Sequence, residues 1–250
     1  MRLHLISCEI FYREICLAVS RSIHQVDIQF FPKGLHDIGS QKMSQRLQEA
    51  LDRVDESRYD AILFGYALCN NGIVGLQSRT IPLIVPRAHD CISLFMGSKE
   101  RYLDFFQANS GVYYETSGWL ERGEEITGEL RQISIPSQYG MGQSYEEMVE
   151  KYGEENAQYL YEQLGNLTKH YSKCIFIEMG IEPDDRFERR AREKAESRGW
   201  DFEKIPGDMG LIQRLVDGPW EDNDFLTVPP GHRVVARYDE MILAAEKIKP

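Results

Sequence analysis

The sequence predicts an α/β protein with two Rossmann-like parallel-sheet lobes and a helical middle segment. Short apolar runs alternate with helical patterns over the first hundred residues, and the same alternation resumes after residue 170. The stretch between them is rich in Tyr, Glu and Gln and has few β-branched runs. Such alternation is typical of parallel sheets with helical crossovers. We therefore expect an N-terminal α/β lobe over 1–98, a helical bridge or insertion over 99–170 and a C-terminal α/β lobe over 171–250.

In the first lobe, apolar runs that are short and rich in β-formers predict strands, and apolar residues at helical spacing predict helices. Met43, Leu47, Leu51 and Val54, for example, form one stripe of a helix. We expect strands at 3–7, 26–31, 59–66 and 81–85, and helices at 13–23 and 41–54.

The rest of the chain is assigned by the same patterns. Gly199 stands at a good C-cap position for the charged helix that precedes it. Pro136 and nearby breakers indicate a loop over 133–142. We expect helices at 145–164, 184–198, 209–216 and 238–247, and strands at 174–178, 200–205 and 225–228.

Composition narrows the class of protein and of partner. The 250 residues are 42% hydrophobic and 28% charged, a balance typical of soluble globular proteins. With 40 acidic and 29 basic residues the formal net charge is −11, which argues against nucleic acid or an anionic membrane as the main partner. No long apolar run and no signal peptide is seen, so we expect a cytoplasmic protein.

The chain has five cysteines, an odd number that favours reduced thiols over a disulfide framework. Cys16 falls within a helical pattern and Cys174 opens a strand, so both are interpreted as packing residues. The other three follow predicted strands. The carboxyl ends of parallel strands share one edge of a sheet, where ligands bind.

Cys8, Cys69, His89 and Cys91 are the candidates for a metal site at that edge. Thiolate and imidazole together favour zinc or iron, and three ligands with one open position is the pattern of a catalytic zinc site. No C-x-x-C pair is present, so the ligands would have to come from separate strands. The alternative is that these are small buried residues at strand ends.

Other polar residues at strand ends are candidates for substrate binding or catalysis. Asp90 could orient His89, and Arg87 could hold a carboxylate or phosphate with two hydrogen bonds. The alternatives are an N-cap role for Asp90 and a salt bridge for Arg87. We expect His89, Asp90 and Glu178 as catalytic residues. The expected substrate-binding residues are Arg87, Asn70, Asn71, Tyr114 and Asp208.

Two further features of these strand ends are interpreted as structural. Asp208 also suits the N-cap of the helix that follows it. His36 follows the second strand in a stretch with half of the D-x-H-x-x-G signature of cobalamin binding. Position 34 is Gly instead of Asp, and we interpret this match as coincidence.

Several motifs resemble a known family, the domain-of-unknown-function family numbered sixteen thirty-eight. The motifs that carry the resemblance are FGYALCNNGIVGL at 64–76, PRAHDCI at 86–92, LFMGS at 94–98, YYETSGW at 113–119, YGEENA at 152–157 and VPPG at 228–231. Genes of that family often lie beside genes for corrinoid-dependent methyltransferases. The resemblance implies a link to methyl-group or corrinoid metabolism, but no particular reaction.

Three functional hypotheses follow. The first is a metal-dependent enzyme of one-carbon or methyl-group metabolism that acts on a small anionic molecule through zinc or iron. The second is an accessory protein that binds a corrinoid or a metal and works with a corrinoid protein or methyltransferase. The third is a metal-free cysteine enzyme, which the lack of a cysteine after a strand of the second lobe disfavours.

Overall fold

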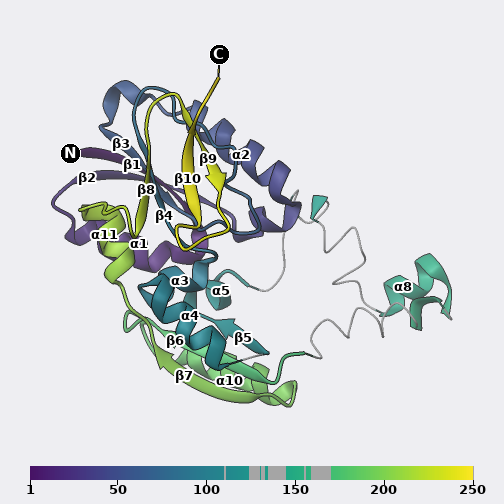
Figure 1. The fold of residues 1–250 in the computed structure, drawn as a ribbon. Coiled ribbons are helices and arrows are strands. Elements are labelled where there is room, and N and C mark those ends of the chain that lie inside the picture. The colour runs from purple at the N-terminus through teal and green to yellow at the C-terminus, as the bar shows by residue number, and fades with distance from the viewer. Residues whose placement is uncertain are drawn as a thin grey trace.

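A mainly parallel sheet and a smaller parallel sheet organise the chain in the computed structural model, which describes residues 1–109, 111–123, 130, 133–134, 145–154, 156–158 and 170–249. The first sheet has the strand order β2-β1-β3-β4-β8 (Figure 1). Its strands are β1 (Arg2–Cys8), β2 (Gln25–Phe31), β3 (Ala61–Gly65), β4 (Leu83–Pro86) and β8 (Phe225–Val228). The α/β class expected from the sequence is thereby confirmed.

The first four strands run parallel, so their carboxyl ends lie at one edge. β3 is buried at all five positions, which explains why it reads as one apolar run. The connection from β1 to β2 runs in one direction along the sheet, and the connection from β2 to β3 runs in the other direction, past β1. Because such crossovers are right-handed, the two connecting helices lie on opposite faces of the sheet. Figure 1 shows this for α1 (Tyr12–Arg21) and α2 (Ser40–Asp52). The later helix α11 (Gly210–Asp217) packs beside α1.

The second sheet has three parallel strands in the order β5-β6-β7, at Val112–Glu115, Lys173–Glu178 and Asp201–Pro206. Side chains alternate across β6: Phe176 packs in a small cluster with Phe187 of α10 (Arg186–Ser197), while Ile175 and Ile177 join the large core of the first sheet. One continuous apolar core therefore connects both sheets.

The strands do not follow the expected segments. β5 comes from the stretch expected to be a helical bridge, and β8, placed in the C-terminal lobe, pairs antiparallel with β4 of the first sheet. The stretch before β5 does contain helices, α3 (Cys91–Met96) and α4 (Lys99–Ala108), and α5 (Ser117–Glu121) follows β5. The proposed limits of the three segments stay a prediction.

The expected helix over 145–164 is interrupted. The helix α8 covers Tyr145–Tyr152, and Gly153 follows it with a left-handed backbone (φ 78°). Glycine in this conformation is a common helix terminator because it has no Cβ to clash. Most of the remainder of that expected helix, and most of the loop expected at 133–142, lies outside the described residues.

The expected helix over 238–247 is wrong. Residues 232–247 form an antiparallel hairpin of β9 (His232–Ala236) and β10 (Leu243–Lys247). Its turn is closed by the Asp239 carboxylate, which accepts from the backbone N–H of Met241, and by a left-handed Ile242 (φ 61°). The apolar spacing in this stretch fits either structure, and pairing with β9 decides for the strand.

None of the helices among the described residues is long and apolar enough to cross a membrane.

Candidate functional site

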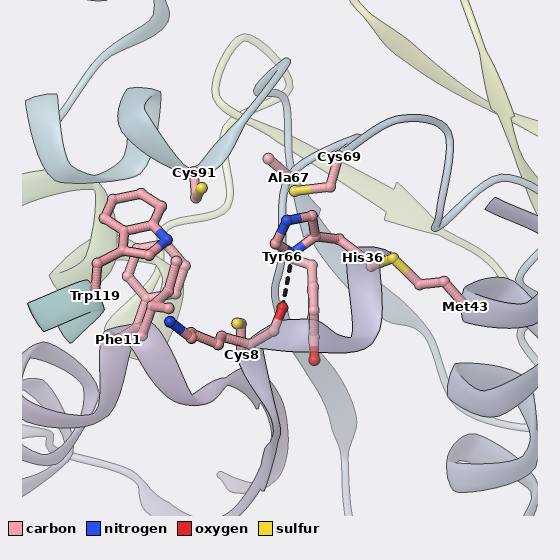
Figure 2. A pocket seen from close by; sticks show the side chains of 11 residues that line it. Cys8, Phe11, His36, Met43, Tyr66, Ala67, Cys69, Cys91 and Trp119 are labelled. Atoms are coloured by element: carbon pink, nitrogen blue, oxygen red, sulfur yellow. Dashed lines mark hydrogen bonds between the residues drawn. The ribbon is translucent and has the colours of Figure 1, made fainter. Parts of the chain in front are cut away.

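A pocket opens at the carboxyl ends of β1, β3 and β4. It is lined by three cysteines from separate parts of the chain, namely Cys8, Cys69 and Cys91, hereafter the pocket cysteines (Figure 2). The other lining residues are Ile10, Phe11, Lys33, His36, Met43, Tyr66, Ala67 and Trp119. The structure places these three expected metal ligands around one pocket, and their role as ligands stays a prediction.

Each pocket cysteine is placed by the end of a different strand. Cys8 is the last residue of β1, Cys69 lies in the loop after β3, and Cys91 is the first residue of α3 after β4. Backbone hydrogen bonds join the two loops: Leu68 N–H donates to Ala88 O and Cys69 N–H donates to His89 O, at 2.9 and 3.1 Å. These bonds hold the loop of Cys69 against the segment that leads to Cys91.

The turn that carries Cys69 has an uncommon backbone. Cys69, Asn70 and Asn71 all have positive φ, at 43°, 56° and 62°. For residues with a Cβ this region costs roughly 1–2 kcal/mol each, although Asn tolerates it better than most. Gly72 then packs so closely that an added Cβ would lie 2.1 Å from the sulfur of Met43. Local strain and a tight approach thus fix where the Cys69 thiol stands.

The pocket cysteines differ in how readily they ionise. Burial raises the pKa of Cys8 to about 12, and the neighbouring Cys69 sulfur together with burial raises the pKa of Cys91. The Cys91 thiol, acting as a hydrogen-bond donor, lowers the pKa of Cys69, and the charge of His36 adds to this effect. The pocket therefore favours one thiolate, at Cys69, beside two neutral thiols.

His36 stands at the mouth of the pocket, on the 3-10 turn Lys33–Ile38 that follows β2. Its Nδ1 lies 2.7 Å from the backbone oxygen of Lys33, and its Nε2 lies 2.9 Å from Asp37 Oδ1. Burial works to lower the pKa of His36, but the bond to Asp37 and its charge outweigh burial and raise the pKa. A protonated His36 thus places a positive charge close to the Cys69 thiolate.

The far wall of the pocket is aromatic and rigid. Phe11 stacks on Phe95 with ring centroids 4.6 Å apart, and Phe95 contacts Trp119 at 5.5 Å. Gly118 allows α5 to approach the first sheet, because a Cβ there would lie 1.8 Å from the Ile10 carbonyl oxygen. Between these walls lies a cavity of about 30 Å³. One water needs roughly 10–15 Å³ of such volume, so the cavity suits a single ion or a ligand of two or three heavy atoms.

The side chains of the pocket do not already surround a metal. In the described part of the chain, no group of three or more His, Cys, Asp and Glu side chains is arranged so that it could hold an ion. The ligand types are nevertheless those of soft metals, since thiolates select zinc, copper(I) and iron. The arrangement offers thiolate chemistry at Cys69 and, if the thiols draw together, a sulfur-rich metal site.

His89 and Asp90, two of the expected catalytic residues, do not line the pocket. The His89 side chain is exposed, and only its backbone oxygen takes part, as acceptor for Cys69. The Asp90 carboxylate caps α3 by accepting from Ile92 N–H at 3.0 Å and also accepts from the Tyr102 hydroxyl at 2.7 Å. The N-cap alternative thus describes the position of Asp90, and His36 is the histidine beside the pocket cysteines.

Arg87, expected to anchor an anionic substrate, is buried and occupied within the fold. Its guanidinium donates to the backbone oxygen and carboxylate of Asp222, at 2.5 and 2.7 Å. It also donates to the backbone oxygens of Met241 and Leu243 in the C-terminal hairpin. Arg87 therefore ties the hairpin to the end of β4 and does not line the pocket.

The remaining expected binding residues lie apart from the pocket. Asn70 and Asn71 are exposed on the left-handed turn. Tyr114 packs on Phe105, and burial raises the pKa of its hydroxyl to about 12. The Asp208 carboxylate accepts from Gly210 N–H at 2.6 Å, at the start of α11. Its role there is that of a local cap.

Glu178, the third expected catalytic residue, ends β6 in the second sheet. Its carboxylate accepts from Lys204 Nζ at 3.0 Å and is well exposed. The structure thus brings together the three expected cysteines, and His36, not His89, lies beside them. The sequence contained a signal for both added residues: His36 also follows a strand, and Trp119 ends the aromatic motif YYETSGW at 113–119, which could close over the strand ends but also suits a core-lining segment.

Comparison with known proteins yields one match. Residues 30–216 match the model of a family described as "Protein of unknown function (DUF1638)". The chain belongs to this family. The matched residues include Cys69, Cys91 and His36 but begin after Cys8. No curated protein and no solved structure matches the chain.

Proposed function

We propose that this member of DUF1638 is a metal-dependent enzyme whose zinc or iron ion is held by the thiolates of Cys8, Cys69 and Cys91. The observation that supports this most is that three thiols from three strand ends line one cavity of about 30 Å³. Three sulfur ligands with a fourth position left for substrate is a pattern of catalytic zinc sites. A small anionic molecule would occupy the fourth position.

Electrostatics supports a cation in this pocket. Three thiolates in a largely apolar cavity would repel one another and lack solvent, which is why the pKa values of Cys8 and Cys91 are raised. A divalent ion would reverse this balance and hold all three as thiolates. Cysteine side chains turn about a single bond, so the pocket cysteines would close on the ion by rotation about χ1.

In this proposal His36 is a positioning residue and not a ligand. Both of its ring nitrogens are engaged, Nδ1 with the Lys33 carbonyl and Nε2 with Asp37. From the mouth of the pocket it would supply a positive charge, and a proton, next to the open position. It would act on metal binding through Cys69, whose thiolate its charge favours.

The link to one-carbon or methyl-group metabolism rests on the resemblance of the motifs. A corrinoid macrocycle is far larger than the cavity, so a corrinoid would have to reach the site at its mouth, carried by a partner protein. If the protein is instead an accessory that delivers a metal, the ion should leave readily to an acceptor protein. A cytoplasmic, reducing setting fits the five cysteines, all of which are free.

The deciding experiment is metal analysis of anaerobically purified and reconstituted protein. We expect one zinc or iron ion per chain and no acid-labile sulfide. Serine at any one of the pocket cysteines should abolish most of the metal, whereas Cys16→Ser, on α1 outside the pocket, should leave it unchanged. Wild-type protein that stays metal-free after reconstitution would overturn the proposal.

A second candidate, a metal-free cysteine enzyme, is favoured by one observation. The pKa of Cys69 is lowered while those of Cys8 and Cys91 are raised, which is the pattern expected of one nucleophilic thiol. If metal-free native protein reacts with iodoacetamide selectively and rapidly at Cys69 at neutral pH, this candidate gains over the metal enzyme. Slow, unselective alkylation would exclude it.

A further inference from the structure

Trp119 presents a polar group to a pocket wall that is otherwise mostly apolar. Figure 2 shows its indole beside Phe11, with the ring nitrogen turned towards the space between the pocket cysteines. Within the residues that the structure describes, the Nε1–H of Trp119 donates no hydrogen bond. The indole of Trp220, by contrast, donates to the backbone oxygen of Leu215 at 2.9 Å. Trp119 is half-buried, and its Nε1–H is not among the fully buried polar atoms of the described residues, so it is open to a ligand that enters the pocket.

The position of the indole is set by the fold. The close approach at Gly118 leaves α5 no room to retreat from the Ile10 carbonyl. The ring is further held by Phe95, which itself stacks on Phe11. A donor fixed in this way loses little freedom when it binds, and such preorganised donors contribute most to recognition.

The size and charge of the pocket define which ligands the Nε1–H of Trp119 could bind. The cavity of about 30 Å³ has to hold the ion as well, so a ligand bound to the ion must be small and reach out towards the mouth of the pocket. Two basic side chains, Lys33 and His36, line the same pocket. Indole nitrogen is a donor only, so the ligand atom that it meets must be an acceptor. A small anion fits all three conditions better than a neutral or a cationic molecule.

We propose that Trp119 determines ligand specificity, by donating its Nε1–H to a small anion of two or three heavy atoms bound at the open position of the metal. The proposal rests on the proposed function, because the pocket cysteines must hold the ion. Formate and azide are suitable probes, since both are anions of three heavy atoms. Acetate, with a further methyl group, exceeds the room available.

The first test uses cobalt(II)-loaded protein, in which thiolate-to-cobalt absorption reports on the fourth ligand. Trp119→Phe retains an aromatic ring without the N–H, and Trp200→Phe, in the second sheet, is the matched control. We expect both variants to load cobalt like the wild type. Trp119→Phe should bind formate and azide about five- to tenfold more weakly, the loss expected for one hydrogen bond, and the control should bind normally. None of the three proteins, the wild type and the two variants, should bind acetate.

A second test needs no variant at the site. The chain has three Trp residues, so a zinc-loaded, nitrogen-15-labelled sample gives three indole N–H signals. Formate should shift one of them strongly, and that signal should be present in Trp200→Phe. Equal anion affinity in wild type and Trp119→Phe, or no indole shift with formate bound, would overturn this inference while leaving the metal site intact. Failure of the wild type to load any metal would refute both proposals.

Discussion

The carboxyl edges of the two parallel sheets differ in how their polar residues are used. At the second sheet, Glu178 is paired with Lys204, and Asp208 caps the next helix. At the first sheet, the pocket cysteines face a shared cavity, and one of them sits on a strained turn. Both edges have the position at which parallel sheets bind ligands, the carboxyl ends of the strands. A place at the end of a strand is therefore not enough to make a binding site. The side chains at that strand end must also be left without structural partners.

The largest expected effect separates the pocket cysteines from those that pack elsewhere. Cys69→Ser should weaken zinc binding by more than about 100-fold, because it removes a ligand, whereas loss of a mere outer partner costs about 10- to 100-fold. Cys174→Ser, in the buried face of β6, should leave zinc affinity unchanged. Competition with a chromophoric chelator measures both constants. If both variants lost zinc affinity to the same extent, the cysteines of the two sheets would not differ in function.

Metal affinity at the first edge should depend steeply on pH. Cys8 and Cys91 have raised pKa values and are protonated in the metal-free protein at neutral pH, so binding must displace at least two protons. Affinity should therefore fall by at least roughly 100-fold for each unit that the pH drops. Proton release on zinc addition, measured with an indicator dye in weak buffer, checks the count. Release of no proton would mean that the thiols are not the ligands.

Glu14 provides a test of the packing between the two sheets. It lies on α1, fully buried and with no hydrogen-bond partner for either carboxylate oxygen among the described residues. Burial, with a contribution from the charge of Glu182 beyond β6, raises the pKa of Glu14 from 4.5 to about 7.

The stability that Glu14 contributes in its neutral form is present below pH 4.5 and is lost as the pH rises from there to about 7. The loss amounts to about 3 kcal/mol, from 1.36 kcal/mol for each unit of pKa shift. Glu14→Gln should remove this pH dependence, so its advantage over the wild type should grow between pH 5 and pH 8. Urea unfolding at both pH values measures the difference. A parallel decline in the two proteins would show that Glu14 is not the group responsible.

Two histidines sharpen the comparison within the first edge. His36→Gln should weaken zinc binding by up to about tenfold, because without His36 the pKa of Cys69 rises and its thiolate forms less readily. His89→Gln should have no measurable effect, because that side chain is exposed and does not line the pocket. Titrations of both variants in the same buffer give the ratio. The reverse order would restore His89 as the ligand expected from the sequence.

The smallest effect is expected at the second edge. Glu178→Gln breaks an exposed ion pair with Lys204 and should cost less than about 1 kcal/mol of unfolding free energy. It should change neither metal content nor anion binding. A loss of activity, once a substrate is known, would place chemistry at the second sheet and contradict the comparison.

The sequence predicted the parts of this account that depend on local pattern. Apolar runs located the parallel strands of the first sheet, and their ends located Cys8, Cys69 and Cys91, whereas β5 of the second sheet was missed. It could not choose between His36 and His89, because both follow strands and only the turn after β2 directs a ring to the pocket mouth.

Long-range contacts were beyond local pattern. The partners of Arg87 in the C-terminal hairpin lie more than a hundred residues away, and that hairpin was itself expected to be a helix. Trp119 reaches the pocket only because Gly118 packs against the Ile10 carbonyl, a contact that no spacing reveals. Residues that serve the fold and residues that serve a site look alike until their partners are known.

One metal ion, in the proposed function, draws the three pocket cysteines together. X-ray absorption at the zinc edge, on wild-type protein loaded with one equivalent of zinc, measures this directly. We expect three sulfur ligands at about 2.3 Å and one lighter oxygen or nitrogen ligand at about 2.0–2.1 Å. The zinc that Cys8→Ser still retains should have one sulfur ligand fewer. A zinc ion surrounded by oxygen and nitrogen alone would refute a site made of the pocket cysteines.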